Sequence, residues 1–115
     1  MNIEEFRDYC LAKPGVTEEM PFGPDTLVFK VGGKVFALTD INTFSSINLK
    51  CDPERAIALR DHFDSIQPGY HMNKKHWNTV VLANEIKNAL LLELIDHSYS
   101  LVFNGLTQLQ RKEFI

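Results

Sequence analysis

The chain has 115 residues, which is the length of one ordinary domain and too short for two. Its composition, 44% hydrophobic and 23% charged, is typical of a folded globular protein and excludes the disordered and fibrous classes. Fifteen acidic against twelve basic side chains give a net charge of −3, which excludes a histone-like protein that coats phosphates by bulk charge but permits a small basic face.

No run of about 18 apolar residues is present, so we expect no membrane span. Residues 1–5 show neither the basic nor the apolar region of a secretory signal. Cys10 and Cys51 are isolated in the sequence and form no CxxC pair. They could form one disulfide, but a domain of this size can build a core without it, so reduced, partly buried thiols are favoured. Together these features predict a cytoplasmic protein.

The first predicted element is a helix over residues 2–13. Asn2 can cap its N-terminus, with Glu5 at the third helical position as in a capping box. Pro14 and the glycine after it end the helix. Residues 14–26 hold three prolines and two glycines, so this segment is expected to be an ordered loop.

Two β-rich runs, residues 27–31 and 34–39, flank Gly32-Gly33 and predict a hairpin. A third strand is expected over residues 44–50. Because side chains alternate along a strand, the odd-numbered ones should be buried and the even-numbered ones should point away from the core. The buried set is Ile47, Leu49 and Cys51, and the outward set is Ser46, Asn48 and Lys50.

The second half of the chain starts with a helix signal at Asp52-Pro53, and this helix is expected to reach residue 62 and to bury Ala56, Ile57 and Leu59. A turn at residues 67–70 and a strand over 77–83 follow. A long helix should then begin at residue 84 or 85, or as late as 87–89, and run to 104, with a short terminal helix over 106–114.

This order, α-β-β-β-α-β-α, predicts an α+β fold. It would form one domain over residues 1–115, with an antiparallel sheet and helices packed on one face of that sheet.

The densest group of candidate functional residues lies between Asp64 and Glu85, a window without any acid. Lys74 and Lys75 lie in this window among histidines, a tryptophan, a tyrosine and asparagines. Cations, planar rings and amides are the groups that contact phosphates and stack on bases. Residue types alone favour a simpler interpretation, a solvated loop that leads into a strand whose Trp77 closes the core edge.

No pattern in the chain indicates an enzyme or a metal site. His71 and His76 are five residues apart, which matches neither strand nor helix ligand spacing, and no third ligand joins them. Nucleophile-elbow, zinc-protease and phosphate-loop motifs are all missing from the sequence. We therefore assign no catalytic residue, no metal and no cofactor.

Four stretches of the sequence together resemble the MmcQ/YjbR family of small bacterial cytoplasmic proteins. They are Lys13-Pro14-Gly15 with Pro21-Phe22-Gly23-Pro24, residues 28–37, residues 68–78 and the pair Ser98-Tyr99. The resemblance implies a compact α+β fold described as CyaY-like, whose sheet is likened to the double wing of a phage transcription factor. That likeness underlies the view of the family as DNA-binding, and the family has no established catalytic residues to carry over.

The leading functional hypothesis is a DNA-binding protein that uses the basic-aromatic loop and the polar sheet face. Its candidate residues are Asn73, Lys74, Lys75, His76 and Trp77, with Lys30, Lys34 and Lys50 from the sheet. The alternative is a non-catalytic module that binds a protein or a small ligand in a cleft lined by Phe22, Tyr70, His71 and Trp77.

Overall fold

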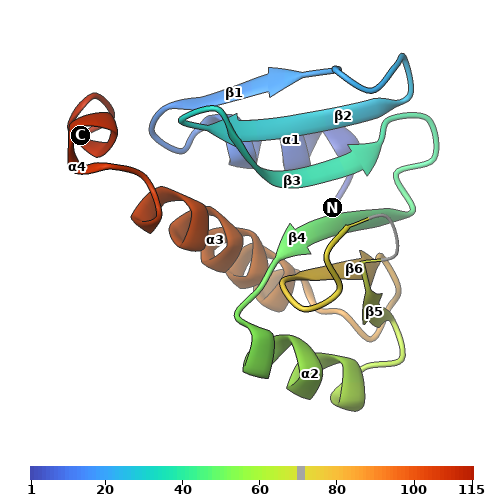
Figure 1. Cartoon of the computed structure of the whole chain (residues 1–115). Helices are drawn as coiled ribbons and strands as arrows, with labels where there is room; N and C mark the ends of the chain where they lie inside the picture. The colour runs from blue at the N-terminus through green and yellow to red at the C-terminus, as the bar shows by residue number, and fades with distance from the viewer. Residues whose placement is uncertain (70–71) are drawn as a thin grey trace.

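The computed structural model describes residues 1–69 and 72–115. Within them, six strands form one antiparallel sheet in the order β1-β2-β3-β4-β6-β5 (Figure 1). The strands are β1 (Val16–Glu19), β2 (Thr26–Val31), β3 (Lys34–Asp40), β4 (Ser46–Lys50), β5 (Ile66–Pro68) and β6 (Trp77–Val81). The helices are α1 (Ile3–Leu11), α2 (Pro53–His62), α3 (Asn88–Asn104) and α4 (Gln108–Lys112). The predicted α+β class is confirmed.

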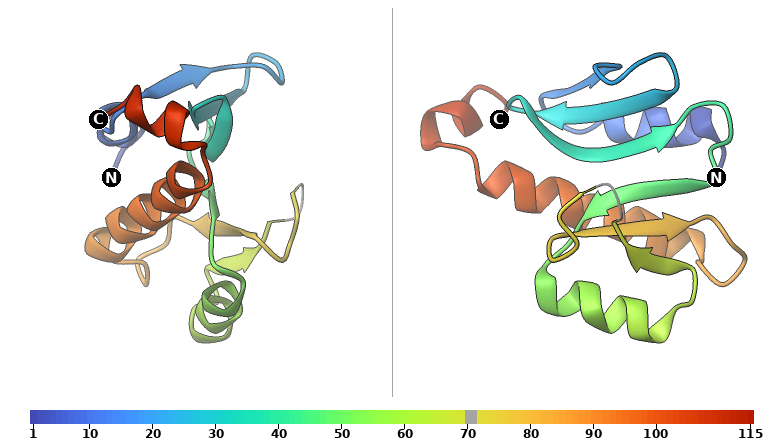
Figure 2. Two further views of the ribbon diagram at one scale, coloured as in Figure 1. Left: turned by 60° about the vertical axis from the view of Figure 1, so that its left-hand side comes forward. Right: turned by 45° about the vertical axis from the view of Figure 1, so that its right-hand side comes forward.

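The two faces of the sheet are covered differently. Figure 2 shows α1 and α3 on one face, while residues 72–76, ahead of β6, project from the other face. The helix α2 lies at the β5–β6 end of the sheet, where the Ala56 carbonyl accepts a 3.4 Å hydrogen bond from the Asn78 side chain. None of the described helices has the length and apolar composition needed to cross a bilayer.

Local signals in the sequence set several element boundaries. Asn2 and Glu5 form the expected reciprocal capping box at the start of α1. Asp52 caps α2 through the Arg55 N–H, with Pro53 in the first turn. The hairpin between β2 and β3 turns at Gly32 and Gly33, whose φ angles of +59° and +79° are those that a two-residue turn of this kind requires. These three predictions are confirmed.

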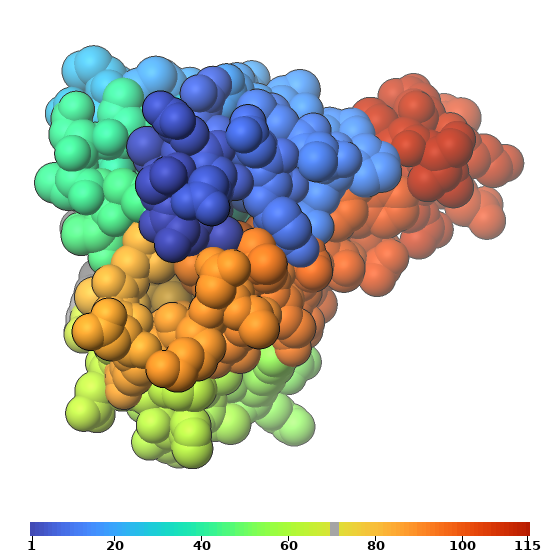
Figure 3. Space-filling view, turned by 180° about the vertical axis from the view of Figure 1, so that it is seen from behind, coloured from blue at the N-terminus to red at the C-terminus, as the bar shows by residue number. Residues whose placement is uncertain are grey.

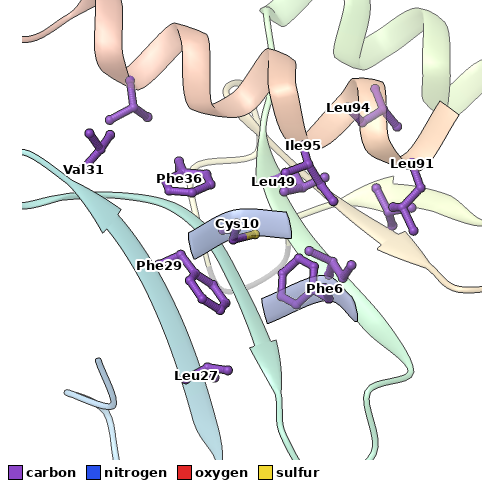
Figure 4. Packing of buried hydrophobic residues seen from close by; sticks show 14 of the residues in the cluster. Phe6, Cys10, Leu27, Phe29, Val31, Phe36, Leu49, Leu91, Leu94 and Ile95 are labelled. Carbon is purple, nitrogen blue, oxygen red and sulfur yellow. The ribbon is translucent and has the colours of Figure 1, made fainter. Parts of the chain in front are cut away.

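Aromatic side chains from separate elements meet in the main core, between the sheet and helices α1 and α3 (Figure 4). The Phe6 ring from α1 packs edge-on against the Phe29 ring of β2, with centroids 5.3 Å apart. It also meets the Phe44 ring, 5.5 Å away. Because fully buried aromatic side chains contribute the largest apolar areas, this cluster anchors α1 to the sheet.

The register of β4 agrees with the sequence prediction. Ile47 and Leu49 are 0% and 2% exposed, whereas Ser46 and Asn48 are only half-buried and alternate with them on the opposite face. Cys51, directly after the strand, is also buried, as predicted, and neither it nor Cys10 forms a disulfide. Burial raises the pKa of the Cys10 thiol to about 12, so this thiol stays protonated at neutral pH.

A serine hydroxyl completes the ladder where β3 and β4 separate. These strands pair only from Ala37↔Leu49 to Thr39↔Ile47. At the next position the Lys50 N–H donates to the Ser98 hydroxyl at 2.8 Å, and that hydroxyl donates to the Phe36 carbonyl at 2.5 Å. Ser98 is fully buried. Through this side chain, α3 supplies the hydrogen-bond partners that β3 and β4 no longer give each other where they separate.

Several expected boundaries are wrong. Residues 16–19, expected as loop, form β1, and Gln67 and Pro68, expected in a turn, belong to β5. Both are short edge strands that pair with the next strand across six or eight intervening residues, so neither carries the signal of a tight hairpin turn. The helix α1 ends at residue 11 rather than 13, and β6 ends at 81 rather than 83.

Burial on α2 also differs from the prediction. Ala56 is buried, but Ile57 is 55% exposed and Leu59 only half-buried, because α2 meets the sheet along a narrow stripe at β5 and β6. The long helix α3 begins at Asn88, at the late end of the range considered.

Candidate functional site

The lysine-bearing turn ahead of β6 is closed by backbone hydrogen bonds. The His76 N–H donates to the Asn73 carbonyl at 3.1 Å, and the Cys51 N–H donates to the His76 carbonyl at 2.8 Å. At the base of the connection the Gly69 N–H donates to the Trp77 carbonyl at 3.0 Å. The turn is therefore held to the end of β4 as well as to β5 and β6.

Two side chains reinforce this turn. The Asn73 side-chain oxygen accepts a 2.9 Å hydrogen bond from the Lys75 N–H, which makes an Asx turn and engages that amide oxygen in holding the backbone. From α2, the Arg60 guanidinium donates to the Lys74 carbonyl at 3.0 Å. A third cation thus lies at the same turn as Lys74 and Lys75, whose own side chains are exposed.

The polar face of the sheet continues from this turn. The register pairs Lys50 with Trp77 and Asn48 with Thr79, and the Thr79 hydroxyl donates to the Asn48 side chain at 2.6 Å. All four residues are half-buried and alternate with core residues, so they share the face opposite α3. We define the basic face as Lys50, Arg60, Asn73, Lys74, Lys75, His76 and Trp77.

The other two candidate lysines lie apart from the basic face. Lys30 is two strands away from Lys50 and is ion-paired with Glu19 at 2.8 Å. Lys34 is at the β2–β3 turn, paired in register with the core residue Val31, which places it on the helix side of the sheet. The structure therefore brings together six of the eight sequence candidates.

Of the residues proposed for a ligand cleft, Tyr70 and His71 lie outside the described residues. Phe22 is 71% exposed on the loop between β1 and β2, at the end of the sheet where Thr26 pairs with Asp40. Trp77 begins β6 at the opposite end of the strands. The two described members of the set are therefore not neighbours.

Sequence reasoning did not find Arg60. It lies in the last turn of a helix that starts on a clear capping signal, and nothing in its local pattern links it to a turn fourteen residues later. Its place at the basic face follows from the way α2 packs on β5 and β6.

A second polar cluster joins the end of α1 to α3, and its polar groups bind one another. The Lys13 ammonium binds Asp96 and lies 4.6 Å from the Tyr9 ring centre and 5.4 Å from that of Tyr99. The Tyr9 hydroxyl donates to Asp96 at 2.7 Å, which together with partial burial raises the pKa of Tyr9 to about 12. The Tyr99 hydroxyl donates to the Pro14 carbonyl at 2.7 Å. Lys13 and Tyr99, two of the residues that carry the family resemblance, thus connect the end of α1 to α3.

Comparison with known proteins identifies the family. The family model named YjbR matches residues 11–101. Protein YbdF from Escherichia coli O157:H7 is 44% identical over 110 residues, which cover 95% of this chain and 90% of that protein. Protein YjbR from Escherichia coli K12 is 33% identical over 113 residues, covering 97% and 96% of the two chains.

Solved structures give the same result for the fold. The crystal structure of Deinococcus radiodurans protein DR2400, described as a DUF419 domain, matches with a TM-score of 0.90 and 45% identity, covering 97% of this chain and 86% of that one. The crystal structure of a Pseudomonas syringae protein matches with a TM-score of 0.75 and 33% identity, covering 89% and 99%. The resemblance inferred from the sequence motifs is confirmed, and the chain belongs to the YjbR family.

Proposed function

We propose that the protein binds DNA through the basic face. The observation that carries this proposal is the contact between Arg60 and the Lys74 carbonyl, which gathers three cations at one turn of a protein whose net charge is −3. Because the protein as a whole is acidic, a phosphate backbone would be attracted to a local cluster of cations rather than to the overall charge.

Each part of the basic face has a chemical role in this proposal. Lys74, Lys75 and Arg60 would contact phosphates. Trp77 and His76 offer planar rings beside them, suitable for stacking on an exposed base. The Asn73 side chain orients the turn, since its oxygen is already engaged by the Lys75 N–H. With so few cations, binding without sequence preference should be weak, with Kd of about 10⁻⁴ M or higher at physiological salt.

A salt titration tests the proposal. Binding of a short fluorescein-labelled duplex, and of its single strand, is measured by anisotropy for the native protein and for Lys74→Ala/Lys75→Ala. Each phosphate contact contributes about 0.9 to the slope of log K against log salt for duplex, so the double variant should lose about 2 units of slope.

The matched control is Lys87→Ala/Lys112→Ala, which removes two exposed lysines outside the basic face and should leave the slope unchanged. No binding of the native protein to either form of DNA at low salt would refute the proposal. An unchanged slope in the Lys74→Ala/Lys75→Ala variant would place any DNA contact elsewhere.

A further inference from the structure

A groove of about 550 Å³ lies on the far side of the sheet from the basic face, between α1 and the strands β1 and β2. Its apolar part is formed by Ile3, Leu27 and Ile41. Its charged part is formed by Glu4, Arg7 and Glu18, while Glu19, the next residue of β1, turns its carboxylate to the other face of the sheet and binds Lys30. It is therefore an apolar groove with an acidic rim, in contrast to the basic face.

Part of this rim is fixed in place. Arg7 makes two bonds to Glu18, from Nε at 2.9 Å and from Nη2 at 2.5 Å, which hold α1 against β1. Glu19 is paired with Lys30 at 2.8 Å. Glu4, exposed on the first turn of α1, makes no ion pair within the described part of the chain. With Glu18 bound by Arg7 and Glu19 bound by Lys30, Glu4 leaves the rim with a net charge of −1 toward an incoming ligand.

The strand beside the groove is an edge. Within residues 1–69 and 72–115, β1 pairs with β2 alone, so one side of its backbone has no strand partner. Figure 3 shows α1 facing the viewer in the upper part of the molecule, with the segment that follows it alongside. Edge strands accept an extended segment from another chain through main-chain hydrogen bonds, while alternate side chains of that segment fill neighbouring pockets.

We propose that β1 and this groove bind an extended basic segment of a partner protein, which adds to the sheet as a further strand. Its lysine or arginine side chains would face the carboxylate rim, and its apolar side chains would contact the groove and the exposed Met20. Phe22, exposed on the adjoining loop, offers a further apolar contact.

Charge selects this occupant over a second copy of the chain. Pairing of β1 with β1 of another copy would place the Glu18–Arg7 and Glu19–Lys30 pairs of the two copies side by side, with no opposite charge left on either strand to attract the other. A basic strand meets the same carboxylates with opposite charge. The edge is therefore unsuited to self-association and suited to a cationic segment.

The probe is a blocked hexapeptide of alternating lysine and valine, with a glutamate–valine peptide as its control. Titration into the ¹⁵N-labelled full chain should shift the amides of residues 16–19 and slow the hydrogen exchange of those on the outer edge. The glutamate–valine peptide should produce neither change. Shifts confined to other parts of the chain, or equal binding of both peptides, would overturn the proposal.

A pair of variants distinguishes binding at the groove from attraction to the overall charge of the protein. Glu4→Lys replaces an attractive charge at the groove by a repulsive one and should weaken lysine–valine binding at least about fivefold. Asp8→Lys makes the same charge change on α1 outside the groove and should alter the affinity less than twofold. Equal weakening by both variants would show attraction to the protein's net charge, without a groove site.

Discussion

The two ends of the sheet differ in charge and in the way they are held. We call α1, β1 and β2 the acidic end, because residues 1–25 contain six acidic and two basic side chains. We call α2, β5 and β6 the basic end, because residues 65–84 contain two lysines and no acid, while the two arginines of α2 are balanced by Glu54 and Asp61. The acidic end rests on a cluster of phenylalanines, whereas the basic end rests on smaller buried side chains, Ala56, Ile66 and Val80.

Side-chain pairs connect the elements at the acidic end. Arg7 with Glu18 joins α1 to β1, and Lys13 with Asp96 joins α1 to α3. At the basic end the turn ahead of β6 is closed mainly by backbone bonds. Arg55 of α2 also binds Glu93 of α3. Lys75 holds the turn through its backbone N–H, so its side chain can be changed at small cost to the fold, while at the acidic end charge and stability are coupled.

The largest expected difference between the two ends concerns apolar packing. Phe6→Ala removes a fully buried ring from the acidic end and should lower the free energy of unfolding by about 3–5 kcal/mol. Ile57→Ala at the basic end truncates an exposed side chain and should change it by less than about 0.5 kcal/mol. Urea unfolding followed by circular dichroism measures both, with Phe6→Leu as a milder variant if Phe6→Ala does not fold. Equal losses would contradict the comparison.

The next effect lies at the seam between the two ends, where Ser98 bridges β3 and β4. Ser98→Ala leaves the Lys50 N–H and the Phe36 carbonyl without their partner and should cost about 1–3 kcal/mol. Ser100→Ala, exposed on the same helix, is the control and should be neutral. Amide exchange of Lys50 should quicken in the Ser98 variant. A stability equal to that of the native protein would mean that the strands close directly on each other.

The elements that sequence reasoning predicted well are those with a signal of their own. Asn2 with Glu5, Asp52 with Pro53, and Gly32-Gly33 each satisfy backbone groups within a few residues, so their effect is readable locally. The strands β1 and β5 depend on pairing with partners that the chain reaches only when folded, so composition alone favoured loop and turn.

The same division between local and tertiary signals applies to the candidate site. The run of Asn73, Lys74, Lys75 and His76 is contiguous in sequence, so its charge and ring content could be seen directly. Arg60 reaches it only through the packing of α2, and the separation of Lys34 from Lys50 follows from strand register. The position of Arg60 and the separation of the two lysines both depend on tertiary structure, and no local pattern in the sequence predicts them.

A smaller, pH-dependent effect tests the charge coupling at the acidic end. Burial raises the pKa of Asp96, but hydrogen bonds from Lys13 and Tyr9 outweigh it and leave the pKa below its ordinary value. The stabilisation is therefore present above the unfolded pKa, near 3.9, and is lost as pH falls through the folded pKa. Asp96→Asn should cost about 1 kcal/mol at pH 7, and this difference should vanish in acid.

Urea unfolding of the native protein and of Asp96→Asn between pH 7 and pH 3 gives this dependence. Asp61→Asn, at an exposed position on α2, is the control for the basic end and should track the native protein throughout. A difference between the native protein and Asp96→Asn that persists undiminished in acid would show that shape, and not charge, links α1 to α3.

The smallest expected effect is at the basic end, where removing a charge should leave the free energy of unfolding almost unchanged. The bonds that hold the turn involve the Lys75 N–H and other backbone groups, which Lys75→Ala retains. This variant should therefore unfold within about 0.5 kcal/mol of the native protein. It should also lose about 0.9 units of salt slope in duplex binding, as one phosphate contact does. If its stability fell by more than 1 kcal/mol, the lysine stem would be part of the turn's packing. A lower slope of log K against log salt would then reflect a change in the shape of the turn as well as the loss of its charge.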